Sequence, residues 1–366
     1  MSDLSSHTGS LSLENIFSGN IFIFHAFDVG DDINLEDIRQ SGVVHSLPLQ
    51  LSKYFKNYHI PLAVQLPDAP GAGYRVSSKI HNFGVISHAY KIPFTGTLDA
   101  LRKDIDTIYY AYKQQSIKDA HELFGLVQSH IKQPTFFHLR SAYVVIQIDP
   151  QPDTVDITAL KDTYGNTIAS IIRFETEYLS EYQRNDILNH AIGYYRGDLI
   201  IIDTEAAFLY DKEYEDILDF FEFANIQQLE LKYFDRVLDQ KLNTIYEKKT
   251  RNLPLTAYLP FIGSRINDPV SELSSLQVDI SVITERLESS IKIADEPYYS
   301  EVYEILVDKL NIRSWRASLE KKLSIVRNVS VVYQNKIDTI REDMLSVLII
   351  TLIFIELIIG ILSYMK

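Results

Sequence analysis

The last part of the chain is a continuous apolar segment. Residues 344–365 read MLSVLIITLIFIELIIGILSYM, and Glu356 is the only charged residue among them. About 22 residues of α-helix extend roughly 33 Å, which matches a bilayer hydrocarbon core of about 30 Å. A helix that is apolar on every face over this length is seldom the core helix of a soluble domain. The sequence therefore predicts one C-terminal transmembrane helix.

The charges that flank this segment predict its orientation. Five basic residues precede it, and one, Lys366, follows it; the five are Lys321, Lys322, Arg327, Lys336 and Arg341. Positive charge favours the cytoplasmic side of a membrane. The first ten residues contain Asp3 but no basic residue and no apolar run of the kind found in secretory signals. We therefore expect a single-pass, tail-anchored protein of the bacterial inner (cytoplasmic) membrane, with its body facing the cytoplasm.

A long helix is expected to lead into the span. No proline or glycine lies between Tyr298 and Asp343, so the sequence predicts one helix of about 45 residues. Positions 319, 323, 326, 330, 333, 337 and 340 follow one another at alternating spacings of four and three, as in an oligomer seam. Ser330 occupies one of these positions, and the apolar ones are Leu319, Leu323, Val326, Tyr333, Ile337 and Ile340. The same register continues into the apolar segment, and an earlier heptad stretch covers residues 273–287. This pattern predicts an antiparallel helical hairpin that serves as a coiled-coil stalk.

The first two hundred residues have mixed patterns. Strand-like runs cover Ile21–Phe27, Phe83–Ile86, Phe136–Asp149 and Leu199–Asp203, and helical runs cover Leu98–Ile131, Ile157–Arg173 and Tyr214–Arg251. The predicted fold class is α+β: a mixed α/β N-terminal body, then the helical stalk, then the transmembrane helix. The expected domains are a polar tail (1–19), the α/β body (20–210), a helical region (211–297) with a linker (252–268), the stalk helix (298–343) and the span (344–365).

Composition and motifs exclude several functions. The formal charge of −14 repels phosphates, so nucleic acid is not an expected partner. The absence of cysteine excludes disulfides, thiolate metal sites and cysteine nucleophiles. The ten histidines lack metal-ligand spacing, and no Gly-x-Ser-x-Gly nucleophile motif is present. We therefore expect no catalytic, cofactor-binding or metal-ligating residues, no cofactor, and a non-enzymatic protein.

Glu356 is the polar residue in the most costly position. A carboxyl group near the centre of a bilayer costs several kcal/mol unless it is neutral or paired. Two interpretations remain open: Glu356 forms a polar contact between helices of an oligomer, or it lines a polar path. Both require neighbouring helices in the membrane. The partners expected from the sequence are therefore the lipid bilayer and further copies of the chain.

Two short motifs carry a resemblance to a known family. Gly197-Asp198 opens a hydrophobic strand, and Glu296-Pro297-Tyr298-Tyr299 precedes a long helix and an apolar terminal span. From about Gly197 to its end, the chain resembles the "required for meiotic nuclear division" family, a group of uncharacterised function. The resemblance implies a membrane-anchored, self-associating protein with an α/β body and a helical stalk. It does not extend to the first 190 residues, and the mitochondrial role of some members is not implied.

Three functions are compatible with the sequence. The first is a membrane-tethered, self-associating scaffold or interaction protein whose cytoplasmic body binds a protein partner. The second is an oligomeric single-span ion channel or transporter that uses Glu356. The third is a membrane-anchored enzyme whose site lies in the N-terminal body, where no motif is recognised.

Overall fold

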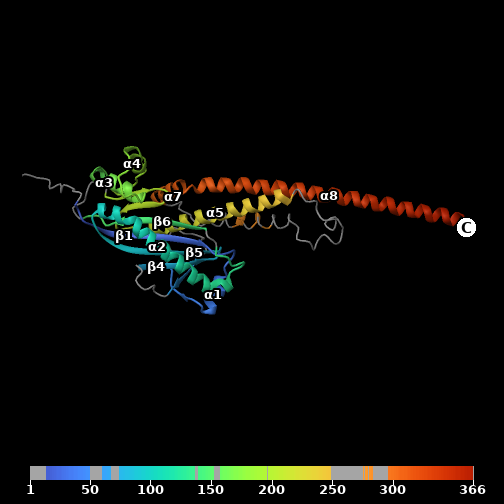
Figure 1. Cartoon of the computed structure of the whole chain (residues 1–366), viewed down its shortest axis with the longest axis horizontal. Helices are drawn as coiled ribbons and strands as arrows, with labels where there is room; N and C mark the ends of the chain where they lie inside the picture. Colours follow the sequence, from blue (N-terminus) through green and yellow to red (C-terminus); the bar gives the residue numbers. More distant parts are fainter. Residues whose placement is uncertain are drawn as a thin grey trace, which may run out of the picture. The chain divides into compact units, whose positions relative to one another are not determined.

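The fold is built around one mixed β-sheet (Figure 1). The computed structural model describes residues 14–49, 60–66, 74–136, 139–151, 157–195, 197–248, several positions between 275 and 282, and 296–365. In this part of the chain, eight strands form a sheet of order β2-β3-β4-β5-β1-β6-β8-β7. The strands are β1 (Phe17–Asp28), β2 (His45–Ser46), β3 (Leu62–Gln65), β4 (Tyr74–His81), β5 (Val85–Gly96), β6 (Arg140–Ile148), β7 (Leu199–Ile202) and β8 (Ala206–Tyr210).

Helices lie between and after the strands. They are α1 (Leu35–Ser41), α2 (Leu98–Val127), α3 (Ile157–Ile172), α4 (Glu181–Leu188), α5 (Glu215–Lys248), α7 (Pro297–Lys309) and α8 (Ile312–Tyr364), with a short 3-10 helix, η1, at Gln128–His130. The strand β6 pairs with β8 in parallel, and the other strand pairs are antiparallel. The predicted mixed α/β body is therefore confirmed.

Helices cover both faces of the sheet. Along the central strand β1, Ile21 and Ile23 belong to an apolar cluster that includes residues of α2, α3 and α4. The neighbouring Phe22 points to the opposite face, where its ring centroid lies 5.6 Å from that of Tyr214, just before α5. On the same face, Tyr143 of β6 stacks on Phe221 of α5 with 5.4 Å between ring centroids. Strands buried on both faces read as apolar runs rather than alternating ones, as β1 and β6 do.

Most predicted elements lie close to their expected bounds, with one displaced strand. Phe83 is not in a strand, because residues 82–84 form the turn between β4 and β5. Gly84 has a positive φ of 98°, and an added Cβ would lie 1.9 Å from the carbonyl oxygen of Gly30. Only glycine fits a turn packed this closely against a neighbouring loop. The strand β5 therefore begins at Val85.

The single helix predicted from Tyr298 to Asp343 is wrong, because the structure divides it. The helix α7 ends at Lys309, and α8 begins at Ile312. Asn311, between them, has a φ of 55°, a left-handed conformation that asparagine tolerates better than most residues. Arg313 forms ion pairs with Glu304 and Asp308, which lie before the break. From Ile312 onward, α8 is continuous for 53 residues, so the predicted run of helix into the apolar segment is confirmed.

The chain forms two compact units. One comprises Met1–Tyr233 and Arg286–Trp315, and the other comprises Phe234–Glu285 and Arg316–Lys366. The α/β unit thus includes the first half of α5 and the whole of α7, which the sequence assigned to separate helical regions. The predicted linker, 252–268, lies outside the described residues. So does most of the 273–287 stretch, and the predicted coiled-coil hairpin is not confirmed.

The second unit contains a contact between α5 and α8. Lys322 of α8 lies 2.7 Å from carboxylate oxygens of both Asp235 and Asp239 of α5. The Ser318 hydroxyl donates a hydrogen bond of 2.7 Å to Asp235. Of the predicted oligomer seam, Leu319 and Val326 are 2% and 0% exposed, so they pack inside the chain.

The other four residues of the predicted seam are either less buried or have side chains outside the described part of the chain. Leu323 and Ile340 are half-buried, whereas the side chains of Tyr333 and Ile337 lie outside the described part. The predicted seam is therefore partly buried within the chain at its start, through Leu319 and Val326.

Candidate functional site

A buried ion pair joins α5 to the sheet. Lys79 Nζ on β4 lies 2.6 Å from Glu222 Oε2 and 4.0 Å from Asp219 Oδ1 on α5. The side chains of Lys79 and Glu222 are each only 8% exposed. Asp219 and Glu222 are three residues apart, which places both carboxylates on the helix face that meets β4.

The ion pair continues into a short hydrogen-bonded chain. The Ser87 hydroxyl on β5 donates a hydrogen bond of 2.8 Å to Glu222 Oε1. His81 Nε2 at the end of β4 lies 3.1 Å from the same hydroxyl oxygen. Burial lowers the pKa of His81 to about 3 despite the nearby Glu222 charge. The imidazole is therefore neutral at physiological pH, and Lys79 and Glu222 carry the charges of this cluster.

Mutual attraction keeps these two groups charged. Burial alone disfavours the ionised form of each. For Lys79 the charges of Glu222 and Asp219 outweigh burial and raise its pKa. For Glu222 the Lys79 charge and the hydrogen bonds from Lys79 and Ser87 outweigh burial and lower its pKa. Each partner therefore depends on the other to stay ionised inside the fold.

A second pair of buried carboxyl groups, one on β1 and one on α5, lies two turns further along α5. Asp28 at the end of β1 and Glu230 on α5 are each 1% exposed. Burial, helped by the charge of Asp31, outweighs a hydrogen bond from the Gly30 amide and raises the pKa of Asp28 to about 8. Burial, with the charge of Asp28, raises the pKa of Glu230 well above its usual range. Burial therefore shifts both groups towards their neutral forms, which reduces the cost of two unpaired buried charges.

The opposite face of the sheet holds a second buried polar group, beneath α2. His25 is 1% exposed, and burial, with the neighbouring His88, Arg140 and Lys113, lowers its pKa to about 3. The Tyr90 hydroxyl donates a hydrogen bond of 2.7 Å to Asp119 of α2. Tyr90 belongs to the apolar cluster that packs against the first half of α2, and a second apolar cluster packs against the second half.

Asp203, in the turn between β7 and β8, ties α3 and α7 to the sheet. This aspartate is 1% exposed and forms an ion pair with Arg173, just after α3. Lys309 Nζ of α7 lies 3.6 Å from its other carboxylate oxygen. The Tyr143 hydroxyl donates a hydrogen bond of 2.8 Å to the Asp203 carbonyl oxygen.

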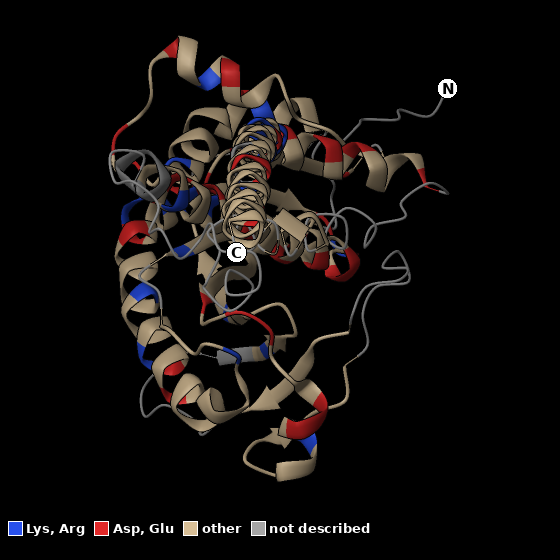
Figure 2. Cartoon of the chain, turned by 90° about the vertical axis from the view of Figure 1, so that its right-hand side faces the viewer, with Lys and Arg blue, Asp and Glu red and all other residues tan. Residues whose placement is uncertain are grey.

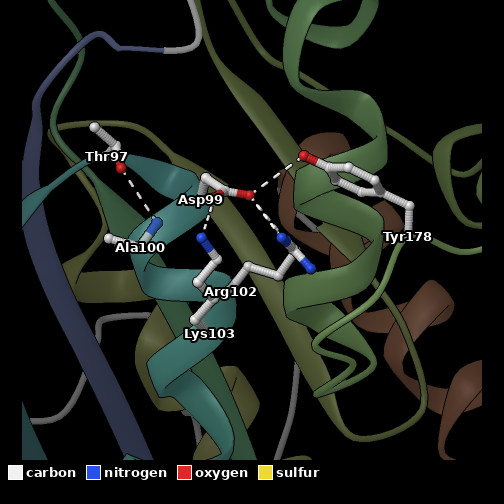
Figure 3. Close-up of polar contacts among 6 residues, drawn as sticks. All are labelled: Thr97, Asp99, Ala100, Arg102, Lys103 and Tyr178. Carbon is white, nitrogen blue, oxygen red and sulfur yellow. Dashed lines mark hydrogen bonds and ion pairs between the residues drawn. The ribbon is translucent and has the colours of Figure 1, made fainter.

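A more exposed polar cluster lies at the start of α2 (Figure 3). Thr97 caps the helix by accepting a hydrogen bond from the Ala100 amide, and Asp99 receives hydrogen bonds from Arg102 and from the Tyr178 hydroxyl. The hydrogen bonds from Lys103 and Arg102 lower the pKa of Asp99 to about 2. The guanidinium of Arg102 also lies 4.5 Å from the centre of the Tyr178 ring. This cluster holds the segment after α3 against the start of α2.

These polar clusters position structural elements, since their members are engaged with one another. Among the described residues, no group of three or more histidines and acidic residues could hold a metal ion. Sequence reasoning missed Lys79, Glu222, Asp28 and Glu230. A signal was present in α5, where Glu222 lies between phenylalanines in the run DFFEFANI. A carboxylate on an otherwise apolar helix face requires a buried partner.

The structure brings together the two motifs on which the family resemblance rested. The Tyr194 ring, close before Gly197 and Asp198, has its centroid 5.0 Å from that of Tyr298. The charge of Asp198 contributes, after burial and Asp211, to raising the pKa of Tyr298. Glu296 and Pro297 are the N-cap and the first residue of α7. The sequence did not predict that these segments would meet.

Glu356 lies in the exposed C-terminal part of α8. The candidate membrane span covers Asp338–Tyr364, with a mean hydropathy of 2.9 over its most apolar window, and none of that window is buried within the chain. In Figure 2 the end of this helix is almost entirely tan, because Glu356 is the only charged residue between Met344 and Tyr364. By length and composition, this helix could cross a membrane.

These features define a class of protein: a mixed α/β body that carries a C-terminal helix apolar enough to span a bilayer. Residues 18–216, more than half of the chain, match the family described as "Uncharacterized protein MJ0711, N-terminal domain". The chain belongs to this family. The match begins in β1 and ends at the start of α5, so it covers the sheet.

One curated relative illustrates the family. The "Uncharacterized protein MJ0711" of Methanocaldococcus jannaschii is 22% identical over 195 residues, which is 53% of this chain and 58% of the relative. The chain therefore matches less than two thirds of that protein's length. No solved structure matches. Nothing in these comparisons links the chain to the "required for meiotic nuclear division" family, so that resemblance stays a prediction.

The buried ion pair generates a prediction about stability. Glu222→Gln leaves the buried Lys79 with only the more distant Asp219 carboxylate as a counter-charge, so we expect it to lower the free energy of unfolding by about 3 kcal/mol, the lower end of the range for breaking a buried pair. The double change Lys79→Met with Glu222→Leu removes both charges and should recover most of this loss. Chemical denaturation of the full chain in detergent measures both effects.

An exposed ion pair provides the control. Arg39 and Glu36 lie 2.9 Å apart on α1 with side chains more than half exposed, so Arg39→Gln should cost less than about 1 kcal/mol. A loss for Glu222→Gln no larger than that for Arg39→Gln would contradict the assigned role of the buried pair.

Proposed function

We propose that this chain is a membrane-tethered interaction protein, without enzymatic activity, whose α/β body is held at the cytoplasmic face of a cell membrane. The observation that carries the proposal is the span Asp338–Tyr364, which is long, apolar and unburied. Monomeric soluble proteins rarely expose contiguous apolar patches larger than a few hundred Å². A helix with this surface requires lipid or other apolar helices around it.

Individual side chains support this placement. Ile350 is 65% exposed, Ile353 is 58% exposed and Phe354 is 63% exposed. Their apolar surface gains roughly 25 cal/mol for each Å² removed from water. Transfer of the whole helix into a bilayer is therefore strongly favoured, and basic residues before the span favour a cytoplasmic body.

The polar clusters of the body support a scaffold more than an enzyme. Lys79 and Asp28 on the sheet and Glu222 and Glu230 on α5 are each less than a tenth exposed. Residues that touch a substrate must be reached from solvent, whereas residues that fix a helix on a sheet need only each other. We therefore assign these groups to the architecture of the body.

Self-association is the second part of the proposal. Glu356 lies inside the span, where a carboxyl group is costly unless it meets a polar partner. Among the described residues, none offers this carboxyl a hydrogen bond or an ion pair within the chain. A second copy of α8 would provide the partner. The alternative is a pore lined by Glu356 carboxylates, and it requires the same assembly.

Charges placed within the span test the membrane anchor. The double change Ile353→Lys with Phe354→Lys puts two ammonium groups near the bilayer centre, each costing about 2.5–3.5 kcal/mol on the insertion scale. We expect this variant to leave the carbonate-resistant membrane fraction.

A matched control lies on the same helix before the span. Val331→Lys with Val332→Lys changes two residues that are 53% and 65% exposed, and it should leave membrane retention unchanged. The anchor assignment fails if both variants are retained equally, or if the wild-type chain is itself extracted by carbonate.

The role of Glu356 is tested by the mass of the full chain in detergent. We expect the wild type to be an oligomer and Glu356→Leu to shift to a smaller species, because the interhelical hydrogen bond is lost. Glu356→Gln keeps a hydrogen-bonding group and should retain the oligomer. A wild-type monomer would rule out self-association, and equal ion flux into vesicles for wild type and Glu356→Leu would rule out the pore.

A further inference from the structure

Four tyrosines from two distant segments form one surface cluster. Tyr194 and Tyr195 follow α4, and Tyr298 and Tyr299 begin α7. The Tyr194 ring centroid lies 4.7 Å from that of Tyr195 and 5.0 Å from that of Tyr298, and Tyr298 lies 5.3 Å from Tyr299. Tyr194 and Tyr195 remain 57% and 69% exposed. We refer to these four residues as the tyrosine surface.

The tyrosine surface is held on the rigid part of the body. The Tyr299 ring stacks on Phe220 of α5, with 5.7 Å between ring centroids. The Tyr303 hydroxyl, one turn further along α7, donates a hydrogen bond of 2.8 Å to Gln227 of α5. Because α7 is fixed in this way, binding to its first turn requires little ordering of the chain.

Acidic residues lie around the tyrosine surface. Asp198 accepts a hydrogen bond of 3.0 Å from the Tyr195 amide. Burial and the charges of Asp211, Asp198 and Glu301 raise the pKa of Tyr298 above its usual range. Burial, together with the like charges of Asp198 and Glu213, raises the pKa of Asp211. These shifts show that several carboxylates act on the same small region.

Acidic residues outnumber basic ones in these segments, where Arg196 and Lys212 are the neighbouring basic residues in the sequence. Within the described part of the chain, Asp198, Asp211, Glu213 and Glu301 form no ion pair with a lysine or arginine. The buried hydroxyl of Tyr298 also has no hydrogen-bond partner among the described residues. Exposed aromatic faces beside unpaired carboxylates form a surface suited to a cation.

We propose that the tyrosine surface and its carboxylates bind a basic segment of a partner protein. Lysine or arginine side chains of that segment would stack on the exposed tyrosine rings and pair with Asp198 and Asp211. The net charge of −14 favours the approach of such a segment. Tyrosine and arginine are also the residues that most often dominate binding energy at protein interfaces. This inference rests on the proposed function, because it names the class of partner.

The test uses the full chain in detergent and a fluorescent peptide of eight residues with alternating arginine and glycine. Tyr195→Ala with Asp198→Asn removes one exposed ring and one negative charge. The asparagine side-chain oxygen can still accept the hydrogen bond from the backbone amide of residue 195. We expect this variant to bind the peptide at least tenfold more weakly than the wild type. A peptide with glutamate in place of arginine should not bind.

The matched control removes the same residue types elsewhere on the body. Tyr182→Ala with Asp186→Asn changes an exposed tyrosine, 78% exposed, and an exposed aspartate of α4. We expect peptide affinity within about twofold of wild type for this control. Equal weakening by both double variants would show attraction to overall charge and would overturn the assigned surface. So would a wild-type chain that does not bind the arginine peptide.

The outcome separates this inference from the proposed function. Peptide binding in detergent does not require a bilayer, whereas retention in carbonate-washed membranes does not require Tyr195 or Asp198. If the Tyr195→Ala, Asp198→Asn variant stays in the membrane fraction but no longer binds the peptide, both the membrane anchor and the tyrosine surface are supported. A chain that stays in the membrane and shows no preference for the tyrosine surface overturns this inference alone.

Discussion

The ion pair between Lys79 and Glu222 constrains the body more than any other interaction described. Each charge is buried, and each would be severely penalised without the other. The helix α5 can therefore lie on the sheet in one register, with Glu222 over β4 and β5. That register also places Glu230 near Asp28, where burial raises the pKa of both carboxyl groups. It places Phe220 and Gln227 where α7 packs, which in turn fixes the first turn of α7.

The later part of α5 forms a similar contact between opposite charges with α8. Asp235 and Asp239 bind Lys322, while Leu319 and Val326 are buried. Two of the six residues of the apolar seam that suggested an oligomer are therefore buried within one chain. Glu356 lies within the span and has no polar partner among the described residues, so it is the residue through which we expect copies to meet. We therefore propose different tasks for the two parts: recognition for the body and membrane attachment for the C-terminal helix.

Sequence patterns predicted the elements well wherever one physical rule dominated. The doubly buried strands β1, β6 and β7 appeared as apolar runs, and α2, α3, α5 and the C-terminal span appeared as long helical runs without proline. The break at Asn311 was missed because no glycine or proline marks it, and asparagine alone seldom ends a helix. The polar partners of α5 were missed because their pairing depends on strand register, which brings Lys79, Ser87 and Glu222 together across 143 residues of chain. The meeting of Tyr194 with Tyr298 depends on the placement of α7 and could not be derived from spacing.

The central claim, that the chain crosses a membrane with its body in the cytoplasm, can be tested directly because the chain contains no cysteine. Single cysteines are introduced as Val331→Cys before the span and Tyr364→Cys at its end, and cells are treated with a membrane-impermeant maleimide. We predict that Tyr364→Cys is labelled in intact cells and that Val331→Cys is labelled only after permeabilisation. Labelling of both positions under the same condition, or the reverse order, would contradict the account.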